Sequence, residues 1–201
     1  MLAMNSLKSM RSPGTWRAAG VALWLLSLIL TGAPVTASVL STSAPVHEAA
    51  FIDTGLADWQ VLRDGVKPGV EVVLLDAGAD GLAQMAAWAQ GRSGYDAIYL
   101  LSHGNSGAIK LGALTLDGDN LQQHSDTLAR IGSALTADGD FLVYGCNVAE
   151  GPTGVEFVGK LAQATGADVG ASDDLRGASG LGGDWVLEAS SNLVTAQALN
   201  L

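Results

Sequence analysis

A cysteine and a histidine each follow an apolar run and stand beside a glycine. Cys146 lies in the segment LVYGCNVAEG, residues 142–151, and is the only cysteine among the 201 residues. His103 lies in the similar segment IYLLSHGNSG, residues 98–107. A thiol can attack a carbonyl carbon when a nearby imidazole accepts its proton and later returns it. The two segments therefore predict one site for cysteine-based chemistry.

Both residues follow expected strands in a chain where short apolar runs alternate with amphipathic segments. Strands are expected at residues 50–53, 70–75, 97–101, 140–144 and 167–171, and helices at 56–62, 81–90, 126–135 and 153–165. Two hairpins are expected, one over 108–116 and one that pairs 185–187 with 193–196. This alternation predicts an α/β fold, a three-layer α/β/α sandwich with a mostly parallel sheet.

The expected sheet would bring the two segments together. Ligands of open α/β sheets bind beyond the carboxyl ends of the strands. If strands 97–101 and 140–144 are parallel neighbours, His103 and Cys146 emerge at the same edge. Gly104 lets the backbone come close to a substrate, and its N–H with that of Cys146 would receive a developing oxyanion.

Each candidate also has a structural alternative. A single cysteine cannot form an internal disulfide, so Cys146 is a buried apolar residue, an intermolecular bridge or a reactive thiol. His103 would otherwise be a structural histidine at a strand end. The segment 117–120, DGDN, lacks the spacing and the distal glutamate of an EF-hand loop, so it predicts a capped turn. One cysteine and one histidine do not complete a zinc site, and neither a metal nor another cofactor is expected.

The first 37 residues are typical of a secretory signal, with a basic start, an apolar run and small residues before an expected cut after Ala37. An uncleaved membrane anchor is the alternative, because the run from Ala18 to Ala37 is just long enough to span a bilayer. Residues 38–48 are expected to be a linker and residues 49–201 one domain. The mature chain would be secreted, periplasmic or at the cell surface, without a membrane contact once the signal is removed.

The charge of the chain limits its partners. The formal net charge is −10 at pH 7, with 20 acidic and 10 basic residues. An acidic balance argues against nucleic acid and against anionic lipid surfaces, which both attract basic proteins. The oligomeric state stays open, and a polypeptide substrate is the partner that a cysteine nucleophile would suit.

The chain resembles DUF4347, a bacterial domain of unknown function found in large secreted or surface proteins. The resemblance covers about residues 49–196 and lies in the segments 51–59, 71–76, 101–107, 142–151, 166–178 and 182–188. The His-Gly and Cys segments also resemble the caspase, gingipain and separase peptidases and the related CHAT domains. In that group, a His-Gly pair ends one parallel strand and the nucleophilic cysteine ends the next, so a caspase-like fold is implied.

Carried onto this sequence, the resemblance implies a role for each matching residue. His103 would be the general base and acid, Cys146 the nucleophile, and the N–H groups of Gly104 and Cys146 the oxyanion hole. The pocket for the residue before the cut would be lined by Glu150, Asp173 and Asp174. Carboxylates there would suit a basic side chain through charge-assisted hydrogen bonds.

Two functions remain open from the sequence. The first is an exported cysteine endopeptidase that cuts its own polypeptide or a neighbour. The second is a non-catalytic cell-surface module, associated with adhesins, that keeps the fold without the activity. An intact His-Gly and Cys pair favours the enzyme.

Overall fold

The structure is a computed structural model that describes residues 46–177, 183–199 and 201. The expected signal of residues 1–37 and most of the linker lie outside these ranges. Within them, no helix has both the length and the apolar character needed to cross a membrane. Glu48, which the sequence placed in the linker, is instead the first residue of a buried strand.

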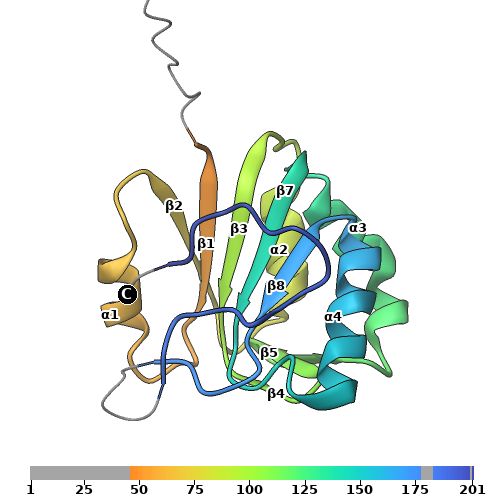
Figure 1. Ribbon diagram of the computed structural model, residues 1–201. Helices are drawn as coiled ribbons and strands as arrows, with labels where there is room; N and C mark the ends of the chain where they lie inside the picture. Colours follow the sequence, from red (N-terminus) through yellow and green to blue (C-terminus); the bar gives the residue numbers. More distant parts are fainter. Residues whose placement is uncertain (1–45, 178–182, 200) are drawn as a thin grey trace, which may run out of the picture. The chain divides into compact units, whose positions relative to one another are not determined.

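The main sheet has six strands in the order β2-β1-β3-β7-β8-β9 (Figure 1). They are β1 (Glu48–Asp53), β2 (Val70–Leu75), β3 (Tyr95–Leu101), β7 (Leu135–Tyr144), β8 (Asp168–Ala171) and β9 (Ala189–Ser190). Every pairing is parallel except that of β8 with β9. The central strands β1 and β3 are almost wholly buried, which explains why they are continuously apolar. The prediction of an α/β fold with a mostly parallel sheet is confirmed.

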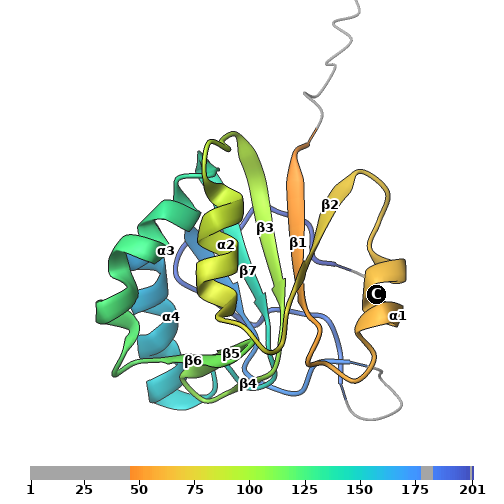
Figure 2. The same cartoon turned by 180° about the vertical axis from the view of Figure 1, so that it is seen from behind.

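Helices of unequal extent cover the two faces of this sheet. They are α1 (Trp59–Gly65), α2 (Gly81–Ala89), α3 (Ser125–Gly132) and α4 (Gly151–Thr165), and a 3₁₀ turn spans Leu121–His124. Figure 2 shows α2 in front of the sheet with α3 beside it, and both join α4 in burying one face. The other face packs against α1 and against the extended segment after residue 183, which crosses the front of the sheet in Figure 1.

That C-terminal segment corrects one prediction. The expected pairing of 185–187 with 193–196 is wrong, since only Ala189–Ser190 forms a strand, against β8. Trp185 and Leu187 instead pack on the sheet face, and the N–H groups of Thr195 and Ala196 both donate to the buried Asp140 carboxylate. The alternating apolar residues of this segment thus reflect packing on the sheet face and not pairing between residues 185–187 and 193–196.

One helix boundary and one short strand also differ from expectation. The helix expected over 126–135 ends at Gly132, and Leu135 already begins β7. A second, three-stranded sheet follows β3 and is built from β4 (Gly104–Asn105), β5 (Ala108–Leu111) and β6 (Leu114–Asp117). The β5–β6 hairpin was expected, whereas the two-residue β4 is too short to leave an apolar pattern.

Helix α4 offers a matched pair of glycine substitutions. A Cβ at Gly159 would have no atom within 4 Å, so Gly159→Ala is expected to raise the free energy of unfolding by about 0.5–1 kcal/mol through helix propensity. A Cβ at Gly154 would lie 2.2 Å from the carbonyl carbon of Ala149, so Gly154→Ala is expected to lower it by about 1–3 kcal/mol. Urea unfolding of both variants tests this; equal changes would contradict it.

Candidate active site

The ladder between β3 and β7 aligns the two sequence segments. Leu101 is the register partner of Tyr144, and the Ser102 N–H donates to the Tyr144 carbonyl at 3.4 Å. His103 and Cys146 each lie two residues beyond these partners. The two residues therefore leave the same edge of the sheet, as the sequence predicted.

Two glycines let the turns after β3 and β7 touch. A Cβ at Gly104 would lie 2.5 Å from Val148 Cγ2 and 2.9 Å from the Cys146 carbonyl oxygen. A Cβ at Gly145 would lie 2.8 Å from Val148 Cγ2 and 3.3 Å from the Gly104 Cα. Real Cβ atoms essentially never lie closer than 3.0 Å to another heavy atom, so a side chain at either position would force its neighbours to shift, and glycine permits the close approach. The Gly104–Gly145 contact fixes the spacing of the two candidate residues.

The second sheet holds the backbone of His103. The Lys110 N–H donates to the His103 carbonyl at 2.8 Å, and the Gly107 N–H donates to the Val148 carbonyl at 3.0 Å. The His103 side chain is exposed and borders a cavity of about 150 Å³ on the β4–β5 hairpin that Cys146 does not line. No hydrogen bond joins its imidazole to the Cys146 thiol within the described ranges.

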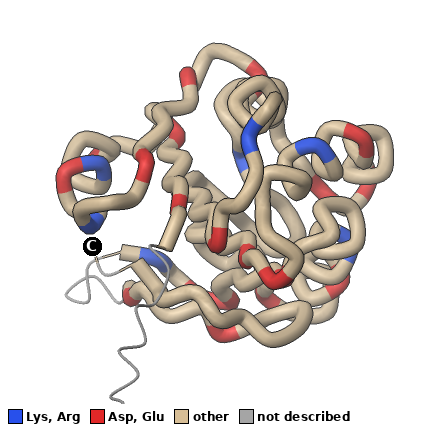
Figure 3. Tube along the Cα trace, turned by 90° about the horizontal axis from the view of Figure 1, so that it is seen from above, with Lys and Arg blue, Asp and Glu red and all other residues tan. Residues whose placement is uncertain are grey.

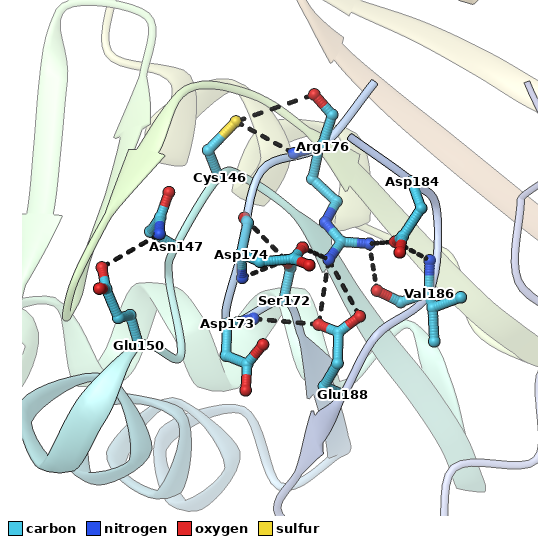
Figure 4. Close-up of polar contacts among 10 residues, drawn as sticks. All are labelled: Cys146, Asn147, Glu150, Ser172, Asp173, Asp174, Arg176, Asp184, Val186 and Glu188. Atoms are coloured by element: carbon cyan, nitrogen blue, oxygen red, sulfur yellow. Dashed lines mark hydrogen bonds and ion pairs between the residues drawn. The ribbon is translucent and has the colours of Figure 1, made fainter. Parts of the chain in front are cut away.

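Cys146 stands on a tight turn between β7 and α4. The next residue, Asn147, has φ = +60° and is the one residue other than glycine with positive φ in the described part of the chain. Asparagine adopts this left-handed region more readily than most residues. Its side-chain amide donates to Glu150 at 3.1 Å (Figure 4), and its N–H donates to the Asp174 carbonyl at 2.7 Å. The partly exposed thiol is thereby held at the tip of the turn.

The segment after β8 lies against this thiol. The Arg176 N–H donates to Cys146 Sγ at 3.4 Å, and the Arg176 carbonyl oxygen is 4.0 Å from the same sulfur (Figure 4). The Ala149 N–H also donates to the Ser172 carbonyl at 2.7 Å, which ties the segment to the turn. The Cys146 N–H, by contrast, has no acceptor among the residues described.

The Arg176 side chain is buried among carboxylates although its main chain touches the thiol. Only 4% of the side chain is exposed. Its guanidinium donates to Asp184 at 2.7 Å, to the two Glu188 oxygens at 3.1 and 3.0 Å, and also to Asp174 and to the Val186 carbonyl (Figure 4). The Arg176 Nε has no partner in this part of the structure. Arg176 therefore lies at the centre of the site, and the sequence analysis did not identify it.

The three predicted pocket residues are placed differently. Asp174 contacts the Arg176 guanidinium, whereas Glu150 contacts Asn147 at the start of α4. Carboxylate oxygens of Asp173, Asp174 and Glu188 lie within 4.8 Å of one another, and all three residues are exposed. Exposed acidic clusters are common without a metal, and here a buried arginine already offsets part of the charge. The role of Glu150, Asp173 and Asp174 toward a substrate stays a prediction.

Local contacts explain two further polar segments. The Asp117 carboxylate accepts the N–H groups of Asp119 and Asn120, both at 3.0 Å, so the DGDN segment is the capped turn that was expected. The Ser102 hydroxyl donates to the neighbouring His103 carbonyl at 3.3 Å, as a turn residue does. Neither segment needs a ligand to explain it.

Comparison with models of protein families gives a match over most of the domain. A family model described as "Domain of unknown function (DUF4347)" matches residues 49–200. The matched range begins within β1 and contains both the His103 and the Cys146 segments. No curated protein matches the chain.

Proposed function

The chain belongs to the DUF4347 family, and from that premise we propose that it is a cysteine endopeptidase with Cys146 as the nucleophile. His103 carries the proton between the thiol and the leaving amine. The observation that supports this most is the β3–β7 register, which brings the His-Gly and Cys turns to one sheet edge, with Gly104 against Gly145. We also propose that the domain is related to the caspase-like peptidases and shares their three-layer fold.

The reaction follows from the groups at this edge. The Cys146 sulfur attacks the carbonyl carbon of a peptide bond, and the charge that develops on the oxygen is received by the N–H of Cys146 and that of Gly104. The Cys146 N–H has no acceptor among the described residues, which leaves it available for this role. The exposed His103 side chain can turn toward the sulfur when a substrate is bound, since catalytic hydrogen bonds often tighten only then.

The partner in this proposal is a polypeptide outside the cytoplasm. Basic residues are scattered singly among more numerous acidic ones along the described chain (Figure 3), an arrangement that does not favour nucleic acid. Glu150, Asp173 and Asp174 would bind the substrate, and the leader of residues 1–37 would direct export.

Peptide cleavage by the full chain and its Cys146→Ala and His103→Ala variants tests the proposal. Cys146→Ala is expected to lose at least about 1,000-fold in rate, because removal of a nucleophile abolishes the covalent route. His103→Ala is expected to lose at least about 100-fold. His124→Ala, at the half-exposed end of the 3₁₀ turn, is the matched histidine control and should keep full activity.

A second function has one observation in its favour. The Arg176 segment lies over the thiol, as it would if Cys146 were only a structural residue. The chain would then be a non-catalytic surface module that keeps the fold. A folded wild type that cleaves no peptide in a mixed library, and whose Cys146 reacts with an irreversible thiol probe only after unfolding, would establish that alternative.

A further inference from the structure

Arg176 occupies the candidate site as a substrate residue would. Its backbone N–H and carbonyl oxygen lie 3.4 and 4.0 Å from the Cys146 sulfur. Its side chain turns away from the sulfur into the carboxylates of Asp174, Asp184 and Glu188 (Figure 4). A peptidase specific for arginine needs the same two features, a peptide carbonyl beside the nucleophile and an acidic pocket for the guanidinium.

We propose that this site is specific for arginine before the cut, and that the Arg176–Gly177 bond of the chain is its own first substrate. This inference rests on the proposed peptidase function and extends it. It narrows the general expectation of a basic side chain to arginine. It also adds Asp184 and Glu188 to the expected acidic pocket, in which Asp174 contacts the guanidinium.

The carboxylates of the pocket match the shape of a guanidinium better than that of a smaller cation. Both Glu188 carboxylate oxygens accept hydrogen bonds from one terminal nitrogen of the guanidinium, and Asp184 accepts one from the other. Both arms of the planar guanidinium are therefore paired with carboxylates. Arg63 and Arg92 have 42% and 43% of their side chains exposed, against 4% for Arg176. The arginine beside the thiol is thus bound in a way that these surface arginines are not.

Gly177, whose nitrogen would be the leaving group, has an open conformation and a hydrogen bond to the following segment. Gly177 has φ = +130°, a conformation open essentially to glycine, and a Cβ there would meet no atom within 4 Å. Its N–H donates to the Asp184 carbonyl at 3.2 Å. The amine that forms on cleavage would therefore stay on the segment that begins near residue 183.

The proposed step balances with water as the only co-reactant. The thiol proton passes to His103 as the sulfur bonds to the Arg176 carbonyl carbon. The bond from that carbon to the Gly177 nitrogen then breaks, and His103 gives the proton to the new amine. Water hydrolyses the thioester, which releases the Arg176 carboxylate and restores the thiol.

Cleavage would leave the two pieces assembled. The segment after the cut is held by β9 on β8, by Asp140 through Thr195 and Ala196, and by the Tyr144 hydroxyl through the Leu199 N–H at 2.8 Å. The fragments should therefore co-migrate under native conditions and separate only on denaturation. After the cut, Arg176 would be a new C-terminus no longer bonded to Gly177. It could then move away from Cys146 and let other polypeptides bind at the site.

Intact-mass spectrometry of the denatured full chain over time tests the inference. The wild type is expected to split between Arg176 and Gly177 at a rate that does not change with protein concentration, whereas Cys146→Ala stays whole. Arg176→Lys should slow the split by at least about 100-fold, because lysine cannot make the forked contacts. Arg130→Lys, on the exposed surface of α3, is the matched control and should split at the wild-type rate.

A synthetic peptide keeps the test independent of how Arg176 variants fold. A peptide of the sequence SDDLRGAS is expected to be cut after arginine, and its lysine counterpart at least about 100-fold more slowly. Cleavage of other peptides by Cys146 with the Arg176–Gly177 bond intact would overturn the inference while the proposed function stands. A split that persists in Cys146→Ala would also overturn it, since a foreign protease would then be responsible. Absence of any Cys146-dependent cleavage would overturn both.

Discussion

Replacing Arg176 with methionine is expected to lower the free energy of unfolding by about 2–4 kcal/mol, the cost of removing one partner from a mostly buried ion pair. The Arg176 side chain is 4% exposed, and its guanidinium pairs with Asp174, Asp184 and Glu188. Without it, three carboxylates would face one another with no cation between them. These carboxylates are themselves 28–52% exposed, so solvent reduces the cost from what a fully buried cluster would show.

Urea unfolding measures this change, and the Cys146→Ala background keeps self-cleavage from affecting the result. Arg63→Met is the matched control, because Arg63 forms an exposed pair with Asp64 and its loss should leave the free energy of unfolding nearly unchanged. A change at Arg176 as small as the one at Arg63 would show that the carboxylate cluster contributes little to holding the segment on Cys146.

The main sheet could be predicted because each of its inner strands carries its own local signal. The run expected at 97–101 lies within β3, and the run expected at 140–144 lies in the buried part of β7. Burial on both faces makes such strands continuously apolar, and turn residues bound them. The parallel placement of His103 and Cys146 followed from this rhythm without any information on contacts.

What the sequence did not predict depends on contacts between distant segments. In the sequence, Arg176 is one basic residue in an acidic stretch. Its burial depends on Asp184 and Glu188, which lie 8 and 12 residues further along the chain. The C-terminal segment has strand-like alternation, yet it packs on the sheet face through single side chains. Residue spacing does not distinguish a strand that pairs from an extended segment that only packs.

Replacing Gly104 with alanine is expected to reduce peptide cleavage by about 100-fold, because displacement of a catalytic group by about 1 Å can cost that much. The new Cβ would lie 2.5 Å from Val148 Cγ2 and 2.9 Å from the Cys146 carbonyl oxygen, so the two turns must separate. The same overpacking is expected to lower the free energy of unfolding by about 1–3 kcal/mol. Gly118→Ala should change neither quantity, since only Lys160 Nζ, at 3.8 Å, would approach its Cβ.

A destabilised control separates lost geometry from lost stability. A Cβ at Gly132 would lie 1.8 Å from the Thr165 carbonyl oxygen, where α3 meets α4 away from the two turns. Gly132→Ala should therefore be destabilised at least as much as Gly104→Ala, yet keep its cleavage rate at temperatures where it remains folded. If both variants lost cleavage in proportion to their stability, the Gly104–Gly145 contact would matter only for folding. If Gly104→Ala alone lost it, the spacing of His103 and Cys146 would be what the chemistry requires.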